Sequence, residues 1–172
     1  TRRLCEWYQC PNLVHSPEFL TSRTAPLDAA MPMRNIIGDP DWERSGSEGL
    51  TSNKGHFALN DLYRLRWPHV PILVMISNES EAVKLFQNSF SAVKVAFFNE
   101  VRTLADKLGL DWETVRNALL AGGMIHPLHT QVPGPDGFRG FGGHCIPKDL
   151  ANLIECGTQA GVGMHVSLAA LH

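Results

Sequence analysis

The sequence predicts an α/β fold in which a few short strands precede a mainly helical part. Residues 36–38 and 70–76 are continuous apolar runs rich in β-branched side chains, which is typical of buried strands. Residues 81–108 instead carry apolar side chains at steps of three and four, which predicts one long helix. A length of 172 residues suits one ordinary domain or pieces of two.

Composition narrows the class of protein. A hydrophobic fraction of 44% and a charged fraction of 19% are typical of a soluble globular chain. The net charge of −2 offers no basic surface for nucleic acid. The longest apolar run, 72–76, is too short to cross a membrane, and no signal peptide opens the chain. We therefore expect neither a nucleic-acid nor a membrane partner.

The four cysteines, at positions 5, 10, 145 and 156, form no CxxC pair and no zinc-type spacing with histidine. This pattern predicts no metal site and a reducing, cytoplasmic compartment.

The N-terminal part is expected to begin with the end of a helix, followed by a short strand. Residues 1–9 resemble the end of a helix with Leu4 and Tyr8 on one face, and 12–15 resemble a short buried strand. Glu18 would then lie at the carboxyl end of that strand, where ligands of open α/β sheets collect. The alternative interpretation is a solvated turn residue.

Two further expectations concern the middle of the chain. The stretch from 39 to 56 is rich in Gly, Ser and Asp and is predicted to be an exposed loop. Pro71 requires the strand in 70–76 to begin after it or to lie at a sheet edge.

The long helix is the strongest pattern in the chain. Asn78 and Glu81 have capping-box spacing at its start, and Gly109 is a plausible stop. Its apolar residues cover more than one face, which favours burial against a second domain or a partner subunit. The main apolar stripe consists of Val83, Phe86, Phe90, Val93, Phe97, Val101, Leu104 and Leu108.

Lys84 and Asn88 are four residues apart on this helix and therefore share a face. An amine beside an amide on a rigid element suits a developing oxyanion, although a solvated surface pair is the simpler interpretation. After Asp111, which is expected to cap a shorter helix, His126 and His129 lie in a loop where either could contact a ligand.

The segment 132–149 is a loop rich in glycine and proline that leads into an apolar-periodic run. Pro147 is typical of a helix first turn, so Cys145 is expected at or just before a helix N-terminus. The positive end of that helix, together with Lys148, would favour a nucleophilic thiolate. The sequence therefore indicates covalent catalysis by Cys145, against the alternative of a buried cysteine beside an ordinary loop.

Three separated motifs resemble the UDP-glucose/GDP-mannose dehydrogenase family of nucleotide-sugar dehydrogenases, and the resemblance runs from about Thr1 to Leu153. In chain order they are Pro17-Glu18-Phe19-Leu20 with Arg34-Asn35-Ile36-Ile37-Gly38, then Lys84-Leu85-Phe86-Gln87-Asn88 with Asn99-Glu100, then Val132-Pro133-Gly134-Pro135-Asp136-Gly137 through Gly142-Gly143-His144-Cys145-Ile146-Pro147-Lys148-Asp149.

The resemblance implies a fold and a reaction. Residues 1–76 would be the end of a Rossmann-like nucleotide-binding domain, and 77–172 a helical central domain that forms a homodimer through helix 81–108. The reaction would oxidise the C6 alcohol of a nucleotide sugar to a uronic acid with NAD, in polysaccharide biosynthesis.

The resemblance also implies residue roles. Cys145 would hold the aldehyde as a thiohemiacetal and later the thioester. Lys84 would stabilise the oxyanion and Asn88 would bind the reacting oxygen, while Asp149 and Glu18 would handle water and protons. Phe141, Gly142, Gly143 and His129 would contact the substrate, and Lys148 is the candidate for contacting the cofactor.

The sequence departs from the family pattern at several places. Ser22 stands where a second glutamate is usual, Arg23 replaces a glycine, and Met124 replaces an arginine that contacts a neighbour's sugar. No G-x-G-x-x-G fingerprint occurs in these residues, and we expect no third domain after about residue 160. We therefore expect a fragment that binds NAD poorly and is inactive by itself.

Two other classes of function stay open. Cys145 could serve a hydrolase or transferase if His144 or His129 were its base, within hydrogen-bond reach of the thiol. Alternatively, the 81–108 helix could form a non-catalytic dimerisation module that does not need Cys145.

Overall fold

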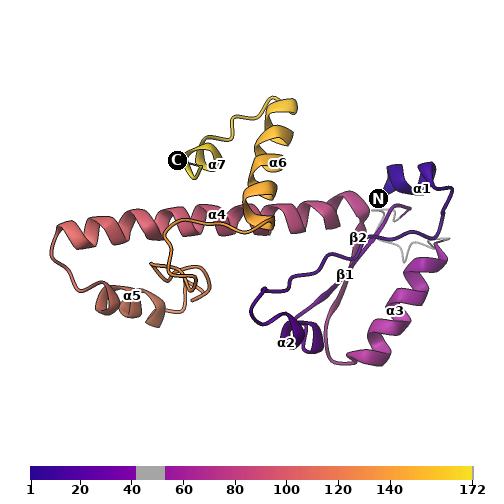
Figure 1. Cartoon of the computed structure of the whole chain (residues 1–172). Coiled ribbons are helices and arrows are strands. Elements are labelled where there is room, and N and C mark those ends of the chain that lie inside the picture. Colours follow the sequence, from indigo (N-terminus) through magenta and orange to yellow (C-terminus); the bar gives the residue numbers. More distant parts are fainter. Residues whose placement is uncertain (42–52, 172) are drawn as a thin grey trace. The chain divides into compact units, whose positions relative to one another are not determined.

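The computed structural model describes residues 1–41 and 53–171, and the chain divides into two compact units, Thr1–Lys84 and Leu85–His172 (Figure 1). The predicted α/β class is confirmed. In the described ranges the order of elements is α1 (Arg2–Trp7), α2 (Ala25–Ala30), β1 (Asn35–Asp39), α3 (Lys54–Arg66), β2 (Ile72–Ile76), α4 (Ser77–Lys107), α5 (Trp112–Ala121), α6 (Cys145–Gln159) and α7 (His165–Ala169).

The first unit is built on two parallel strands, β1 and β2, whose register runs from Asn35 opposite Ile72 to Asp39 opposite Ile76. Parallel neighbours need a crossover connection, and α3 lies in that connection (Figure 1). β1 is buried along its whole length, with Ile36 and Ile37 at its centre. Both predicted strands are confirmed, and β2 begins directly after Pro71.

The prediction of an exposed loop over 39–56 is wrong at both ends. Asp39 is fully buried at the end of β1, where its carboxylate contacts His56 Nδ1 at 3.0 Å. α3 begins at Lys54 because Asn53 caps it, accepting from the Gly55 and His56 amides. The polar composition of this stretch did not reveal that it contains a buried helix cap and a buried contact between Asp39 and His56. Residues 42–52 of this predicted loop lie outside the described residues.

The predicted strand over 12–15 is also wrong, since only His15 pairs, through an isolated antiparallel bridge to Gly38. The Leu13 carbonyl instead accepts hydrogen bonds from Cys5 Sγ and the Asn53 amide group. Glu18 therefore follows an irregular segment that lies beside β1. The helix expected within 1–9 is confirmed as α1.

Three helices, α2, α3 and α7, were not predicted. α2 has no buried residue, α3 buries only His56 and α7 buries only Ser167, so none of them leaves a clear apolar stripe in the sequence.

The long helix α4 starts at Ser77, four residues before the predicted start, because β2 runs into it without a loop. The predicted capping box is wrong, since Glu81 accepts a hydrogen bond from Thr1 Oγ1 at 2.6 Å. The predicted end is confirmed. Gly109 adopts a φ of 67°, and the Gly109 and Leu110 amides bond back to Asp106 and Ala105 in a Schellman arrangement.

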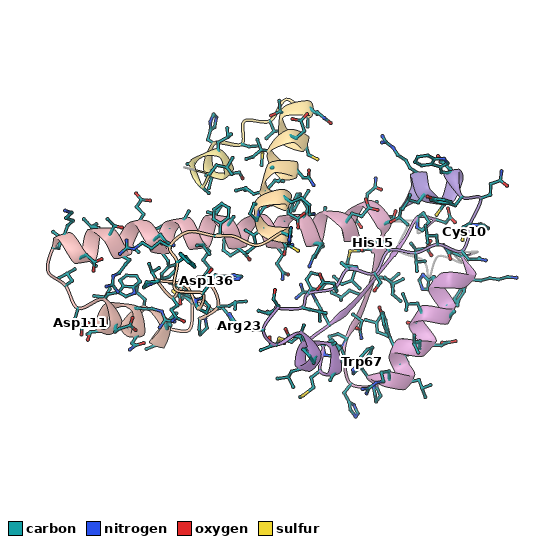
Figure 2. The ribbon with its side chains drawn as sticks, in the orientation of Figure 1. Cys10, His15, Arg23, Trp67, Asp111 and Asp136 are labelled. Carbon is teal, nitrogen blue, oxygen red and sulfur yellow. The ribbon has the colours of Figure 1, made fainter. Side chains whose placement is uncertain are left out.

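The second unit has two small apolar cores, and each includes residues of α4. In the first, Phe98 meets the Trp112 ring edge-on, with centroids 6.2 Å apart. Asp111, labelled in Figure 2, caps α5 by accepting from the Glu113 amide, so the predicted capped helix is confirmed. The first core comprises Phe98, Ala105, Trp112 and Val132, and the second comprises Ala92, Leu150 and Ala170 with partly buried Phe141, Ile146 and Ile154 around it.

The main apolar stripe of α4 is largely exposed in the single chain. Its large side chains are between 53% and 65% exposed, whereas Phe98 on the core side is 2% exposed. The exposed members are Phe86, Phe90, Phe97, Leu104 and Leu108. Within the described ranges no helix combines the length and apolarity needed to cross a membrane.

Replacing Phe98 with alanine should lower the free energy of unfolding by about 3–5 kcal/mol, because the change empties a filled core position. Urea titration followed by tryptophan fluorescence measures the change. The matched control is Phe138→Ala, because Phe138 is 73% exposed and its loss should cost well under about 1 kcal/mol. Equal losses in the two variants would contradict the assignment of this core.

Candidate active site

Cys145 is the first residue of α6 and comes directly after the glycine-rich loop, as predicted. Its thiol is free and exposed. His144 is the N-cap residue but makes no side-chain cap, and Pro147 lies inside the first turn. The amides at this helix start therefore lie next to the thiol without a competing side-chain acceptor.

Asp149, one turn further along α6, is buried and ties this helix to α4. The Asn88 amide group donates to Asp149 Oδ2 at 2.6 Å, and the Lys148 ammonium group contacts Oδ1. Ser89 Oγ donates to the Asp149 backbone carbonyl at 3.2 Å. A buried carboxylate is tolerated when it is paired and hydrogen-bonded in this way.

The charge of Lys148 lies within electrostatic reach of Cys145. The hydrogen bond to Asp149 raises the pKa of Lys148, and the negative charge of Asp149 adds to that rise. Lys148 therefore stays cationic beside the helix start that carries the thiol.

The glycine-rich loop is anchored to α4 by polar contacts that sequence reasoning missed. Arg139 donates to Thr103 Oγ1 at 2.8 Å and pairs with Asp106 at 3.1 Å, while the Gly140 amide donates to Asn99 Oδ1 at 3.1 Å. The motif containing Asn99 was noted, but nothing in its pattern assigns the residue a partner 41 positions away.

Three glycines of the loop, Gly137, Gly140 and Gly143, have a backbone conformation that favours glycine. Gly140 and Gly143 adopt φ values of 82° and 77°, a region that other residues enter only with strain. Phe141 between them packs against the core that contains Leu150, whereas Gly142 and Gly143 are exposed. The loop therefore exposes the backbone of Gly142 and Gly143 to solvent, while the Phe141 ring packs against the core.

In the first unit the structure brings Glu18 and Lys84 together. Lys84 Nζ donates to Glu18 Oε1 at 2.9 Å and to the Glu18 carbonyl, and it also lies over the Phe19 ring. Glu18 Oε2 accepts from the Leu20 amide at 2.7 Å. Partial burial opposes ionisation of Glu18, but the Leu20 amide and Lys84 outweigh it and lower the pKa of the carboxyl.

Lys84 and Asn88, which are four residues apart on α4, each have a carboxylate partner. Lys84 binds Glu18, and Asn88 binds Asp149. Neither is a merely solvated surface group. The ion pair between Lys84 and Glu18 and the hydrogen bond between Asn88 and Asp149 each hold a polar side chain in a defined position.

His129 has the most unusual backbone among the predicted site residues, with a φ of 65°. Burial lowers the pKa of its imidazole, and the nearby charges of Lys94 and His126 lower it further. The ring is therefore neutral at pH 7. Strained backbone at a half-buried, polar side chain is more frequent at functional sites than elsewhere.

The positions that depart from the family pattern lie at the surface. Ser22 and Arg23 are exposed, and Met124 is 95% exposed. None of the three contributes to the polar contacts around Cys145 or Lys84 in the portions of the chain that the structure describes.

The arrangement required for a cysteine hydrolase is not present in the described residues. Within 1–41 and 53–171, neither His144 nor His129 makes a hydrogen bond with the Cys145 thiol. A histidine base for the thiol is the defining contact of that class.

The described residues also offer neither a metal site nor a dinucleotide-binding turn. Across the described parts of the chain, no three His, Cys, Asp or Glu side chains gather as a metal site. β2 passes into α4 without a glycine turn, and no G-x-G-x-x-G occurs in the sequence. The residues present therefore do not fit a dinucleotide pyrophosphate cradle.

Comparison with known proteins identifies the family. Residues 78–172 match the model of the UDP-glucose/GDP-mannose dehydrogenase family, central domain. The UDP-glucose 6-dehydrogenase of Campylobacter jejuni is 33% identical over 154 residues, covering 90% of this chain and 35% of that protein. That of Streptococcus pneumoniae is 33% identical over 155 residues, covering 89% and 36%. The chain thus spans about a third of the length of these relatives.

Solved structures agree with the sequence matches. A UDP-glucose dehydrogenase from the archaeon Pyrobaculum islandicum superimposes with a TM-score of 0.75 at 34% identity, over 92% of this chain and 32% of that one. A GDP-mannose dehydrogenase from Pseudomonas aeruginosa gives a TM-score of 0.52 at 27% identity, over 91% and 32%. The chain belongs to the UDP-glucose/GDP-mannose dehydrogenase family.

Proposed function

We propose that this chain carries the catalytic-cysteine part of a nucleotide-sugar 6-dehydrogenase that oxidises the C6 alcohol of UDP-glucose to a carboxylate. The observation that carries the proposal is the position of the Cys145 thiol at the start of α6, one turn from Asp149. That carboxylate is buried, and both of its oxygens have partners, Asn88 and Lys148. The names of the relatives support UDP-glucose as the substrate. NAD is the proposed oxidant and the cytoplasm the proposed setting.

In this proposal Cys145 performs the covalent chemistry. Its thiolate adds to the C6 aldehyde carbon, forming a C–S bond, and the carbonyl oxygen takes up a proton. After oxidation to the thioester, water attacks the same carbon, the C–S bond breaks and the thiolate is regenerated. The described residues form no cradle for a dinucleotide pyrophosphate, so Lys148 is the one residue among them that we assign to contact the oxidant.

The polar partners have complementary proposed roles. Lys84 supplies positive charge to the oxyanion, and Asn88 donates a hydrogen bond to the reacting oxygen. Glu18 and Asp149 orient water and move protons, for which their carboxylate forms are needed. His129, which is neutral at pH 7, hydrogen-bonds the substrate together with backbone groups of Phe141, Gly142 and Gly143. Lys148 is the proposed contact to the cofactor.

We also propose that the exposed apolar stripe of α4 binds a second copy of the chain. Side chains as large as Phe86, Phe90 and Phe97 seldom line one exposed helix face without a partner. Two antiparallel or parallel copies of such a stripe would cover each other's apolar surface. The exposed apolar stripe is the observation that favours the second candidate function, a dimerisation module.

UDP-glucose should slow the alkylation of Cys145 by iodoacetamide several-fold, because a bound nucleotide sugar would cover the thiol. The corresponding UDP-sugar 6-aldehyde should protect more strongly, since it forms a covalent adduct with the same sulfur. Peptide mass spectrometry measures both effects, with the exposed Cys156 as the internal control. Equal alkylation of Cys145 with and without these sugars would refute the proposed substrate site.

Substituting Lys84 with methionine should raise the pKa of Glu18, because the cation that favours the carboxylate is removed. The ion pair stabilises the fold above the pKa of an unfolded glutamate and is lost as pH falls through the lower folded value. Carbon-detected NMR titration of the Glu18 carboxyl measures the shift. Lys94→Met is the control, since Lys94 bonds to the His126 carbonyl.

A negative charge placed in the apolar stripe should convert a dimer into a monomer. We expect Phe97→Glu to do so, because a carboxylate would be buried without a partner at the interface. Sedimentation velocity measures the species present. The control is Leu119→Glu on α5, a comparably exposed leucine outside the stripe, which should leave the dimer intact. A wild-type chain that is monomeric at all concentrations would contradict the proposed interface.

A further inference from the structure

Cys5 and Cys10 are brought together by the end of the first helix. α1 ends at Trp7, Tyr8 is its C-cap, and Gln9 follows with a φ of 50°. The Cys10 amide donates to the Cys5 carbonyl at 3.0 Å, and the Gln9 amide bonds to the Glu6 carbonyl at 3.4 Å. These two bonds define a Schellman motif, with Cys5 and Cys10 at the two positions whose side chains commonly touch.

The backbone bond sets the distance between the two cysteines. Each Cα is only one or two covalent bonds from the N–H or the C=O of this hydrogen bond, so the two Cα atoms are held a few ångströms apart. A disulfide requires a Cα separation of about 4.4–6.8 Å, and this geometry brings the pair into that range.

The Cys5 thiol points toward the same turn. Cys5 Sγ donates to the Leu13 carbonyl at 3.6 Å, and the Leu13 amide donates to the Cys10 carbonyl at 3.3 Å. Both cysteines are free; Cys5 is half-buried and Cys10 is exposed, at the position labelled in Figure 2. Burial is the main cause that raises the pKa of Cys5; the N-terminal ammonium group opposes this rise, and the charges of Asp41 and Cys10 add to it.

We propose that Cys5 and Cys10 form a reversible dithiol–disulfide pair that is oxidised by small disulfides such as oxidised glutathione. The exposed Cys10 thiolate attacks the external disulfide and releases one thiolate. The Cys5 thiolate then attacks Cys10 Sγ and releases the second. Overall, two protein thiols and one external disulfide give one protein disulfide and two external thiols.

This site is separate from the chemistry assigned to Cys145. The disulfide would replace the hydrogen bond from Cys5 Sγ to the Leu13 carbonyl and close the turn between α1 and the segment that precedes His15. His15 in turn bridges to Gly38 of β1 and contacts Ser80 at the start of α4. Oxidation would therefore stiffen the segment that runs beside the sheet.

The test is to equilibrate the full chain with glutathione buffers of rising oxidised fraction, quench with acid and map the peptides. Trypsin releases residues 4–23 as one peptide that contains both cysteines. The proposal predicts that this peptide loses two hydrogens, and that further cleavage after Glu6 leaves its two parts linked. The internal disulfide should exceed the mixed glutathione disulfides of this peptide by at least about tenfold, as expected for an intramolecular reaction.

Two variants make the result decisive. Cys5→Ser should leave Cys10 to accumulate as a stable glutathione adduct, because the resolving thiol is gone. A trivalent arsenical, which binds paired thiols, should be retained by the reduced wild type and not by Cys5→Ser, with circular dichroism confirming that the variant is folded. Separate glutathione adducts on Cys5 and Cys10 without the internal disulfide, or a disulfide linking two chains through Cys10, would overturn the proposal.

Discussion

The buried carboxylate of Asp149 is the contact on which the arrangement around Cys145 depends. A single carboxylate without partners would be too costly to bury, and Asp149 is held by the Asn88 amide and the Lys148 ammonium. Asn88 belongs to α4 and Lys148 to α6, so the same contact that neutralises the charge also fixes one helix on the other. Because this contact holds α6 against α4, it also sets the position of the Cys145 thiol, which lies one turn away on α6.

The same requirement explains the glycine-rich loop before α6. The loop has few apolar side chains with which to hold itself in place, so polar groups of α4 position its backbone. Asn99 accepts from the Gly140 amide, and Asp106 pairs with Arg139. Val132 at the start of the loop and Phe141 near its end add apolar anchors in the two cores. Backbone amides near the thiol are therefore arranged by a rigid helix instead of by the loop itself.

α4 has different surroundings on its different faces. Phe98 and Ala105 are buried in the second unit, whereas Phe86, Phe90 and Phe97 are exposed. The breadth of the apolar pattern predicted burial of α4 against a second domain or a partner subunit, and the face that carries Phe86, Phe90 and Phe97 is exposed in the single chain. The pattern could not indicate which face the chain itself covers, because both faces consist of the same kinds of side chain at helical spacing.

The sequence by itself determined those features whose cause is local. The strands around Ile36 and Ile72, the stop at Gly109, the Asp111 cap and the helix start at Cys145 all depend on residues within a few positions of one another. Only the tertiary structure decided the partners of the polar groups. Asp39 with His56, Asn88 with Asp149, and Arg139 with Asp106 are 17, 61 and 33 positions apart. A charged or amide side chain looks solvated in sequence, and it becomes a buried contact only when the fold removes water and brings its partner within hydrogen-bond distance.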